Sequence, residues 1–247
     1  MGVKMEIRIQ TARFAGLFLL LLLFSSPLYA LPVTVLTVGA DWTNVQDEFS
    51  TVTYYDTDGI AGNEEIRWGD PATDQGQSGY RFDGAAPPEF TVETGDVFSL
   101  GDFTHTNQPV WGSITGAQLD ITMDLMIGGV ALGEGPFSFS FLHEETTNAC
   151  DTVANPDCAN DLVSFSHLAT SDTFMIDGVE YTLDLIGFSV NDVFMTEFST
   201  IEGQSNTAQL LATFTTASAV PAPPAMLLMA LGLIGVAFSR RSMRSMV

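Results

Sequence analysis

The sequence predicts an all-β domain, a two-sheet antiparallel β-sandwich of jelly-roll-like or immunoglobulin-like type, between an N-terminal signal helix and a C-terminal transmembrane helix. Several short runs alternate apolar and polar residues with a period of two, as half-buried antiparallel strands do. Pairs of turn-forming residues separate these runs. A charge-free apolar run lies near each end of the chain, with basic residues beside it. These observations divide the chain into residues 1–30, 31–219 and 220–247.

The N-terminal segment has the three parts of a secretory signal peptide. Lys4, Arg8 and Arg13 provide the positive region, and residues 14–24 provide the apolar region. Residues 25–30 end in Ala30, a small residue suited to cleavage. We therefore expect cleavage after Ala30; an uncleaved N-terminal anchor is the alternative.

The segment 31–219 is strongly acidic and long enough for one domain with a sizeable core. Of the 30 acidic residues only Glu6 lies outside it, and of the eight basic residues only Arg67 and Arg81 lie inside it. The segment thus carries 29 acids against two bases, a net charge of −27. Such a surface repels phosphate backbones, which excludes nucleic acid as a partner. Its aromatic content argues against a disordered acidic segment.

The period-two alternation predicts the strands. The clearest alternating runs are residues 119–125, 137–141, 181–185 and 210–215. Turns are predicted at Asp58-Gly59, Gly128-Gly129, residues 133–136 and Asp177-Gly178. Asp177-Gly178 lies between two apolar runs and predicts the clearest hairpin of the chain.

The last segment, 220–247, combines a Pro-containing start, an apolar helix and a basic end. Residues 224–239 are predicted to span the membrane, although the apolar run is short for a bilayer core of about 30 Å. A buried core helix is the alternative. The basic end, 240–247, contains Arg240, Arg241 and Arg244, which favour a cytoplasmic location for that end.

This tail resembles the PEP-CTERM sorting signal, with Val220, Pro221, Ala222 and Pro223 at the place of the sorting motif. The resemblance implies recognition, and cleavage of the tail, by a membrane-embedded exosortase in an exopolysaccharide-producing Gram-negative bacterium. The protein would then be anchored in the inner membrane before display at the cell surface or release. The usual motif has Glu where this chain has Ala222, so cleavage is a weaker expectation than membrane placement.

Cys150 and Cys158 are the chain's two cysteines and lie in one polar segment. An even cysteine count in an exported protein favours a disulfide. A metal or redox pair is the alternative, but the spacing matches neither a CxxC motif nor a zinc knuckle.

The segment around Asp56, Asp58 and Asn63 alternates oxygen ligands with glycines and is a candidate Ca²⁺ loop, although it departs from the EF-hand pattern. A solvated Asp-Gly turn is the alternative. A second set of oxygen ligands has the same two interpretations: Asp151, Asp157, Asn160 and Asp161. We expect no cofactor, with Ca²⁺ the one candidate ion.

No catalytic motif is found, so we expect a non-enzymatic protein. His143-Glu144 lacks the second histidine of HExxH, because Thr147 stands at that position. Paired carboxylates of a secreted hydrolase are the remaining enzymatic alternative.

Thr104-His105-Thr106-Asn107 offers many side-chain hydrogen bonds at a strand end. We expect His105 and Asn107 to stabilise a corner where the chain leaves one sheet; ligand binding is the alternative. Thr104, His105 and Asn107 resemble the signature of the THxN group of PEP-CTERM proteins, which overlaps the choice-of-anchor K domain family. The resemblance spans residues 68–212 and implies surface display without adding a catalytic residue.

The leading functional hypothesis is an exported structural or adhesive protein of the cell surface or the extracellular polysaccharide matrix. The alternative is a carbohydrate-binding module, in a form that binds its sugar with or without the assistance of Ca²⁺. Exposed aromatic residues would stack on the sugar in that case, and the candidates are Trp42, Trp68, Tyr80 and Trp111.

Overall fold

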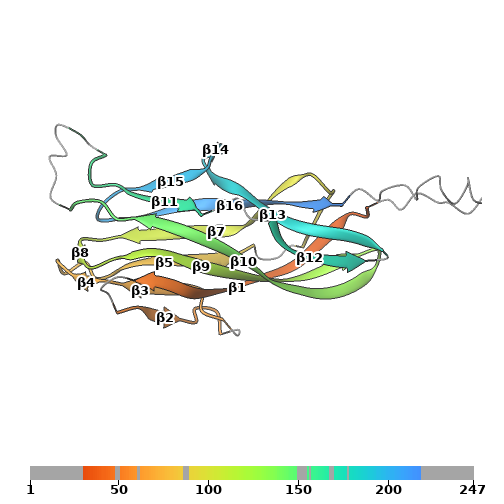
Figure 1. Cartoon of the computed structure of the whole chain (residues 1–247), viewed down its shortest axis with the longest axis horizontal. Helices are drawn as coiled ribbons and strands as arrows, with labels where there is room; N and C mark the ends of the chain where they lie inside the picture. The colour runs from red at the N-terminus through yellow and green to blue at the C-terminus, as the bar shows by residue number, and fades with distance from the viewer. Residues whose placement is uncertain are drawn as a thin grey trace, which may run out of the picture. The chain divides into compact units, whose positions relative to one another are not determined.

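The computed structural model describes residues 30–47, 51–59, 62–85, 89–148, 155, 157–166, 170–176 and 178–217. These residues form two antiparallel sheets and a short two-stranded ribbon, all within the unit that ends at Thr216 (Figure 1). The all-β, two-sheet prediction is therefore confirmed for the described residues. Within those ranges, no helix has the length and hydropathy needed to cross a membrane. The predicted transmembrane helix at 224–239, and the predicted signal helix apart from Ala30, lie outside them.

The first sheet has six strands. In spatial order they are β15 (Glu197–Thr200), β11 (Asp161–Phe165), β10 (Val130–Glu144), β9 (Ile114–Ile127), β1 (Val33–Asp47) and β6 (Phe90–Val92). The order places β15 beside β11, so two segments far apart in the sequence meet at this edge. Asp161 pairs directly with Thr200 across these two strands.

The second sheet has eight strands. In spatial order they are β12 (Thr170–Ile176), β13 (Val179–Val190), β16 (Gln204–Thr216), β7 (Val97–Asn107), β5 (Ser78–Gly84), β3 (Glu65–Trp68) and β2 (Thr53–Tyr55), with β14 (Val193–Met195) paired to β13. The separate ribbon consists of β4 (Asp70–Pro71) and β8 (Val110–Trp111). Tyr80 and His105 lie opposite each other in the β5–β7 pair.

The β9–β10 hairpin confirms one of the predicted turns. Gly128 and Gly129 connect the strands with φ angles of 59° and 81°, and Ile127 pairs with Val130. A two-residue hairpin loop of this type requires positive φ at both central residues, which glycine adopts without a steric penalty. The alternating run 119–125 lies inside β9, as expected.

The predicted turn at residues 133–136 is wrong, because β10 continues through it. The pairing with β9 shifts register between Glu134 and Phe137, which makes this stretch a β-bulge. Gly135 has a φ of 116°, and a Cβ there would lie 2.5 Å from the carbonyl oxygen of Ile121. Glycines at positive φ occur in turns and in bulges alike, and here the opposite strand continues and restores the pairing.

The remaining predicted strands are also confirmed. Residues 181–185 lie in β13 and residues 210–215 in β16. Ile176 pairs with Val179, which confirms the β12–β13 hairpin, and Gly178 in its turn has a φ of 80°. Asp177 lies outside the described residues.

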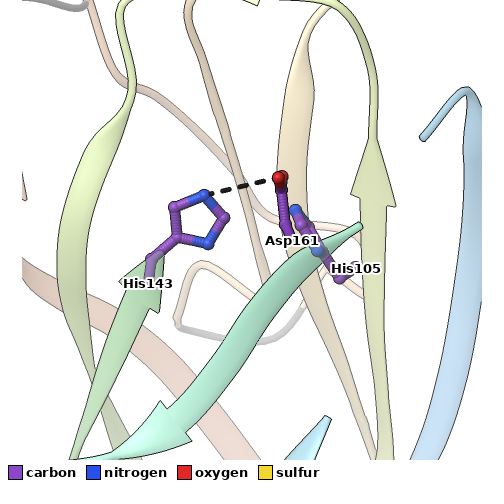
Figure 2. A group of neighbouring side chains, drawn as sticks. All are labelled: His105, His143 and Asp161. Carbon is purple, nitrogen blue, oxygen red and sulfur yellow. Dashed lines mark ion pairs between the residues drawn. The ribbon is translucent and has the colours of Figure 1, made fainter. Parts of the chain in front are cut away.

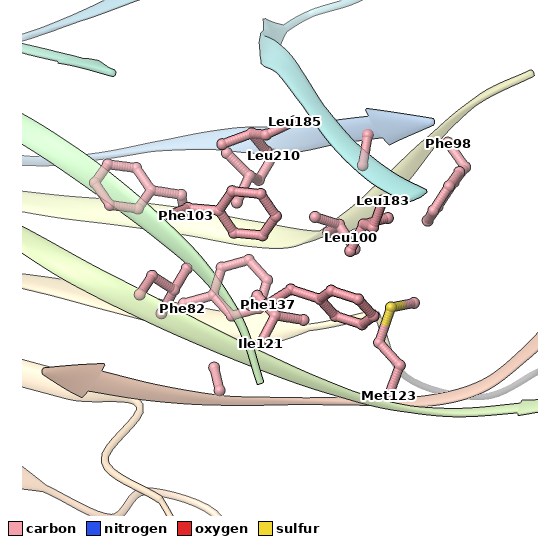
Figure 3. Close-up of a cluster of buried hydrophobic side chains, with 14 of the residues drawn as sticks. Phe82, Phe98, Leu100, Phe103, Ile121, Met123, Phe137, Leu183, Leu185 and Leu210 are labelled. Carbon is pink, nitrogen blue, oxygen red and sulfur yellow. The ribbon is translucent and has the colours of Figure 1, made fainter. Parts of the chain in front are cut away.

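The core lies between the two sheets. Phe103 of β7 and Phe141 of β10 stack with ring centroids 5.4 Å apart, so they join the two sheets directly. Figure 3 shows side chains from both sheets in one cluster, with Leu100 and Leu183 from the second sheet and Phe137 from the first. Burying each such side chain contributes about 1.5–3 kcal/mol, so this interface stabilises the fold.

Candidate functional site

The segment Thr104-His105-Thr106-Asn107 ends strand β7 and keeps its alternation. Thr104 and Thr106 point outward and bond to Thr207 and Ser205 of β16, whereas His105 and Asn107 point inward and have no exposed surface. Because neighbouring side chains of a strand point to opposite faces, two polar groups enter the space between the sheets.

His105 and Asn107 both bond to Thr200 of the other sheet. The Nδ1 of His105 lies 2.7 Å from the hydroxyl of Thr200, and the Asn107 amide donates to the Thr200 carbonyl at 3.2 Å. From the sequence we expect His105 and Asn107 to stabilise a corner at the end of one strand. The structure shows that they also connect the two sheets. The Nε2 of His105 is buried and has no hydrogen-bond partner.

His143 enters the same region from β10 of the first sheet. Its Nδ1 lies 2.7 Å from the Tyr80 hydroxyl of the second sheet, and its ring meets that of His105 edge to face, with centroids 5.2 Å apart. Its Nε2 lies 3.4 Å from an oxygen of Glu145 and 3.9 Å from Oδ2 of Asp161. His143 therefore directs one nitrogen at a hydroxyl and the other at carboxylates.

Asp161 brings a fully buried carboxylate to the two histidines (Figure 2). Its Oδ1 accepts hydrogen bonds from the backbone N–H of Thr146 at 2.9 Å and from the Thr146 hydroxyl at 3.3 Å. Its Oδ2 is buried and accepts none. Glu145, directly after β10, and Glu202, in the turn between β15 and β16, bring two further carboxylates.

We call the five residues His105, His143, Glu145, Asp161 and Glu202 the inter-sheet cluster. The ligand atoms of His105, His143 and Asp161 all lie within 4.8 Å of one another, and so do those of Glu145, Asp161 and Glu202. Among the described residues, one other group of this kind exists, formed by Asp56, Asp58 and Glu64.

Burial and repulsion shift the protonation of the cluster. Burial, together with the charge of Glu145, raises the pKa of Asp161 to about 7. The same two causes raise the pKa of Glu202 to about 7, although the backbone N–H of Gly203 favours its charged form. Burial, and then the charge of His143, holds the pKa of His105 well below its ordinary value. Burial and the charge of Glu145 outweigh the charge of His143, which lowers the pKa of Asp161.

Sequence reasoning treated the members of the inter-sheet cluster separately. The alternation in β10 could have indicated one member, His143. It follows Phe137, Phe139 and Phe141 at every second position, and all four side chains are buried. The sequence predicts Asp161 in an oxygen-ligand set with Asp151, Asp157 and Asn160. The structure separates this set: Asp161 is buried in the cluster, whereas the Asn160 amide donates to Asp157 at 3.2 Å in an exposed contact.

The predicted Ca²⁺ loop is partly brought together. Asp56 and Asp58 approach Glu64, whereas the Asn63 amide donates to Asp41 at 3.0 Å. Asp56 also accepts a hydrogen bond of 2.6 Å from the backbone N–H of Gly59, as expected for an Asp-Gly turn. Ca²⁺ binding at Asp56, Asp58 and Asn63 stays a prediction.

Asp151 and Cys150 lie outside the described residues, and the disulfide between Cys150 and Cys158 stays a prediction.

Three of the four aromatic residues proposed to stack on sugars are buried. Trp42, Trp68 and Tyr80 expose at most 1% of their surface, which corrects their assignment as binding platforms. Of these four residues, Trp111 alone is accessible for stacking on a sugar, with 73% of its surface exposed. It borders a surface pocket of about 430 Å³ that Glu145, Thr146 and Asn148 also line.

Residues 219–241 match the family described as the PEP-CTERM protein-sorting motif. The match includes Val220, Pro221, Ala222 and Pro223, together with Arg240 and Arg241, and it ends before Arg244. This motif indicates sorting to the cell surface by an exosortase-type system. It implies export, membrane anchoring before processing, and an exosortase as the processing partner. No curated protein matches the chain.

Proposed function

We propose that this chain is a surface protein of a Gram-negative bacterium whose acidic β-sandwich is a structural or adhesive component of the extracellular polysaccharide matrix. The match of residues 219–241 to the PEP-CTERM sorting motif carries the proposal, because this motif directs a protein to exosortase-type sorting. The predicted signal peptide at 1–30 supplies the matching entry into the export pathway. The segment 31–219, which we call the body, is then the part of the protein that functions outside the cell.

The charge of the body supports an extracellular role. Its two arginines are both paired, Arg67 with Glu65 and Arg81 with Asp83, so the surface carries a large excess of carboxylates. Such a surface stays soluble and is able to attach to polysaccharides through bridging cations. Absence of a catalytic motif in the sequence supports a non-enzymatic role.

The resemblance to the THxN and choice-of-anchor K group is a further part of the proposal. Thr104, His105 and Asn107 carry it, and His105 and Asn107 connect the two sheets through Thr200. The signature would therefore serve the stability of the displayed domain and not a reaction.

Fractionation of exporting cells with and without their exosortase tests the sorting proposal. We expect the body at the surface or in the medium when exosortase is present, and in the inner membrane with its tail attached when it is deleted. Full-length chain in the cytosol of both strains would overturn the proposal.

The motif variants sharpen this test. Ala222→Glu restores the usual motif and should give processing at least as complete as in the parent chain. Replacing Pro221 and Pro223 with alanine should retain the membrane-anchored form, because the sorting motif is lost. Exchanging Ser242 for Ala, between the arginines, is the matched control and should leave processing unchanged.

A second candidate function is glycan binding at the Trp111 pocket. An exposed indole beside the polar side chains of Glu145, Thr146 and Asn148 suits a sugar, which stacks on the ring and hydrogen-bonds at its edge. Trp111→Ala should abolish binding on an array of bacterial polysaccharides. Phe194→Ala removes another exposed aromatic ring, 55% exposed and not part of the pocket lining, and should leave binding intact. Equal binding by both variants, or no binding by the parent chain, would exclude this function.

A further inference from the structure

We propose that the Nε2 atoms of His105 and His143 and a carboxylate oxygen of Asp161 bind one divalent transition-metal ion between the two sheets. Glu145 and Glu202 supply its remaining ligands. The ion would connect β7 of the second sheet to β10 and β11 of the first sheet, and to the turn that joins β15 of the first sheet to β16 of the second. This inference is independent of how the chain is sorted, and it shares one residue, Glu145, with the proposed glycan pocket.

The first support is the convergence of the side chains. Figure 2 shows His105, His143 and Asp161 projecting toward one another from three strands. Their ligand atoms lie within 4.8 Å of one another. Around an ion with bonds of about 2.1 Å, tetrahedral ligand atoms are about 3.4 Å apart. Small side-chain rotations would therefore bring the three atoms to bonding distance.

The second support is the set of polar atoms left without partners. His105 Nε2, Asp161 Oδ2 and Glu145 Oε1 are all buried and accept or donate no hydrogen bond. Buried polar atoms in folded proteins are nearly always paired, and a bound ion is one recognised explanation for exceptions. These three exceptions belong to residues whose ligand atoms lie close together in the inter-sheet cluster.

The third support is the arrangement of the outer hydroxyl groups. Each histidine has its Nδ1 at 2.7 Å from a hydroxyl, that of Thr200 for His105 and that of Tyr80 for His143. The Thr200 hydroxyl donates to the Asp161 carbonyl at 3.4 Å, so it accepts the Nδ1 proton of His105. The Nε2 of His105 then carries a lone pair directed into the cluster. Metal-binding histidines typically use their second nitrogen in this way.

The fourth support is the charge of the cluster. Three carboxylates meet here, and the two arginines of the body pair elsewhere, with Glu65 and Asp83. The body contains no lysine. A divalent cation would neutralise carboxylates that otherwise repel one another in a buried place.

The ligand types select the class of ion. Two imidazoles suit Zn²⁺, Co²⁺, Ni²⁺, Cu²⁺ or Fe²⁺, whereas Ca²⁺ and Mg²⁺ prefer oxygen ligands alone. The carboxylates of Glu145 and Glu202 beside the three ligands leave little room for a substrate, which is typical of a structural site. The group of Asp56, Asp58 and Glu64 lacks imidazole and has two exposed members, and we assign it no transition metal.

Metal analysis of the chain, expressed with its own export signals and purified without chelators, tests the proposal. After exchange against Zn²⁺ in millimolar Ca²⁺, which occupies surface carboxylates, we expect one retained Zn²⁺ per chain. X-ray absorption of the Zn²⁺ form should show two imidazole ligands. No retained ion, or an ion with oxygen ligands alone, would overturn the proposal.

Variants locate the ion. Tyr80→Phe removes an outer partner and should lower Zn²⁺ affinity about 10–100-fold, and His105→Gln should lower it further. Asp56→Asn, in the other carboxylate group, is the matched control and should bind Zn²⁺ like the parent chain. If His105→Gln does not fold, the Zn²⁺ affinity of Tyr80→Phe and the X-ray absorption spectrum of the parent chain still test whether the ion binds at this cluster. Unchanged affinity in Tyr80→Phe together with loss in Asp56→Asn would contradict the assignment.

Discussion

His105 and Thr200 lie in different sheets and are joined by a buried hydrogen bond of 2.7 Å between Nδ1 and the threonine hydroxyl. Thr200 pairs along its own sheet with Asp161, so the bond connects β7 to the β11–β15 edge. Apolar contacts between sheets are not directional, whereas this bond specifies which strands face each other at this end of the domain.

Removing the Thr200 hydroxyl should destabilise the fold. Thr200→Val leaves the buried Nδ1 of His105 without its partner, and we expect the free energy of unfolding to fall by about 1–3 kcal/mol. Thr207→Val is the control, because Thr207 forms an equally short bond to Thr104 on the exposed face. It should change the free energy by no more than about 0.5 kcal/mol. Urea denaturation measures both, and equal effects would contradict the cross-sheet role.

The two tryptophans Trp42 and Trp111 should respond in opposite ways to truncation. Trp42→Ala removes a buried ring whose indole N–H donates to the Glu64 carbonyl, and should cost about 3–5 kcal/mol of stability. Trp111→Ala should change stability by about 0.5 kcal/mol or less, because that ring is mostly exposed. Thermal unfolding distinguishes them. A large loss of stability in Trp111→Ala would show that this residue belongs to the core.

With a chelator present, stability should fall as the pH rises from about 6.5 to 8. Burial and the charge of Glu145 raise the pKa of Asp161 and Glu202 to about 7, so the folded state holds more protons than the unfolded state from the ordinary carboxyl pKa of about 4 up to about 7. The stability contributed by these protons is lost as the pH rises through about 7. His105, whose pKa is lowered by burial and His143, acts oppositely up to about the ordinary histidine pKa of 6.5, where this window begins. Tyr80 stays neutral throughout it, because burial raises its pKa well above the ordinary value.

Asp161→Asn should reduce this pH dependence, because the substituted amide does not titrate. Chemical denaturation at several pH values, with the chelator in every sample, measures the slope. A stability that rises over this window in the parent chain, or an unchanged slope in the variant, would contradict the shifted pKa of Asp161.

Gly69 and Gly178 share a φ of 80° but differ in their surroundings. A Cβ on Gly178 meets nothing within 4 Å, so Gly178→Ala should cost only the backbone strain, about 1–2 kcal/mol. A Cβ on Gly69 would lie 2.6 Å from the Cβ of Val110, so Gly69→Ala should cost more and displace the wall of the Trp111 pocket. Comparing the urea midpoints of unfolding of the two variants tests this difference. An equal loss of stability would mean that the ribbon at Val110 moves aside without an energetic penalty.

The strands could be predicted from the sequence because their alternation is local. Leu119, Ile121, Met123 and Leu125 follow one another at every second position, and all are buried in β9. The bulge at residues 133–136 could not be distinguished from a turn, because the strand opposite it decides which one forms. Burial of Trp42 and Trp68 was likewise undetermined, since an isolated tryptophan suits a core as well as a surface platform.

The inter-sheet cluster could be predicted only in part. Parity along β10 places His143 on the same face as Phe141, and parity along β7 does the same for His105 and Asn107. Asp161 and Glu202 join them only through the pairing of β11 with β15, which connects residues about 40 positions apart. Such non-local pairing is not encoded in the spacing of any single segment.

The intact mass of the protein recovered from the surface of exporting cells tests the sorting proposal most directly. We expect a chain that begins at Leu31, lacks the predicted helix and the basic end of the tail, and weighs two hydrogens less than its reduced form, as the predicted disulfide between Cys150 and Cys158 requires. The same chain from cells without exosortase should keep the complete tail. A mass equal to that of all 247 residues in both preparations would contradict signal-peptide removal and tail processing alike.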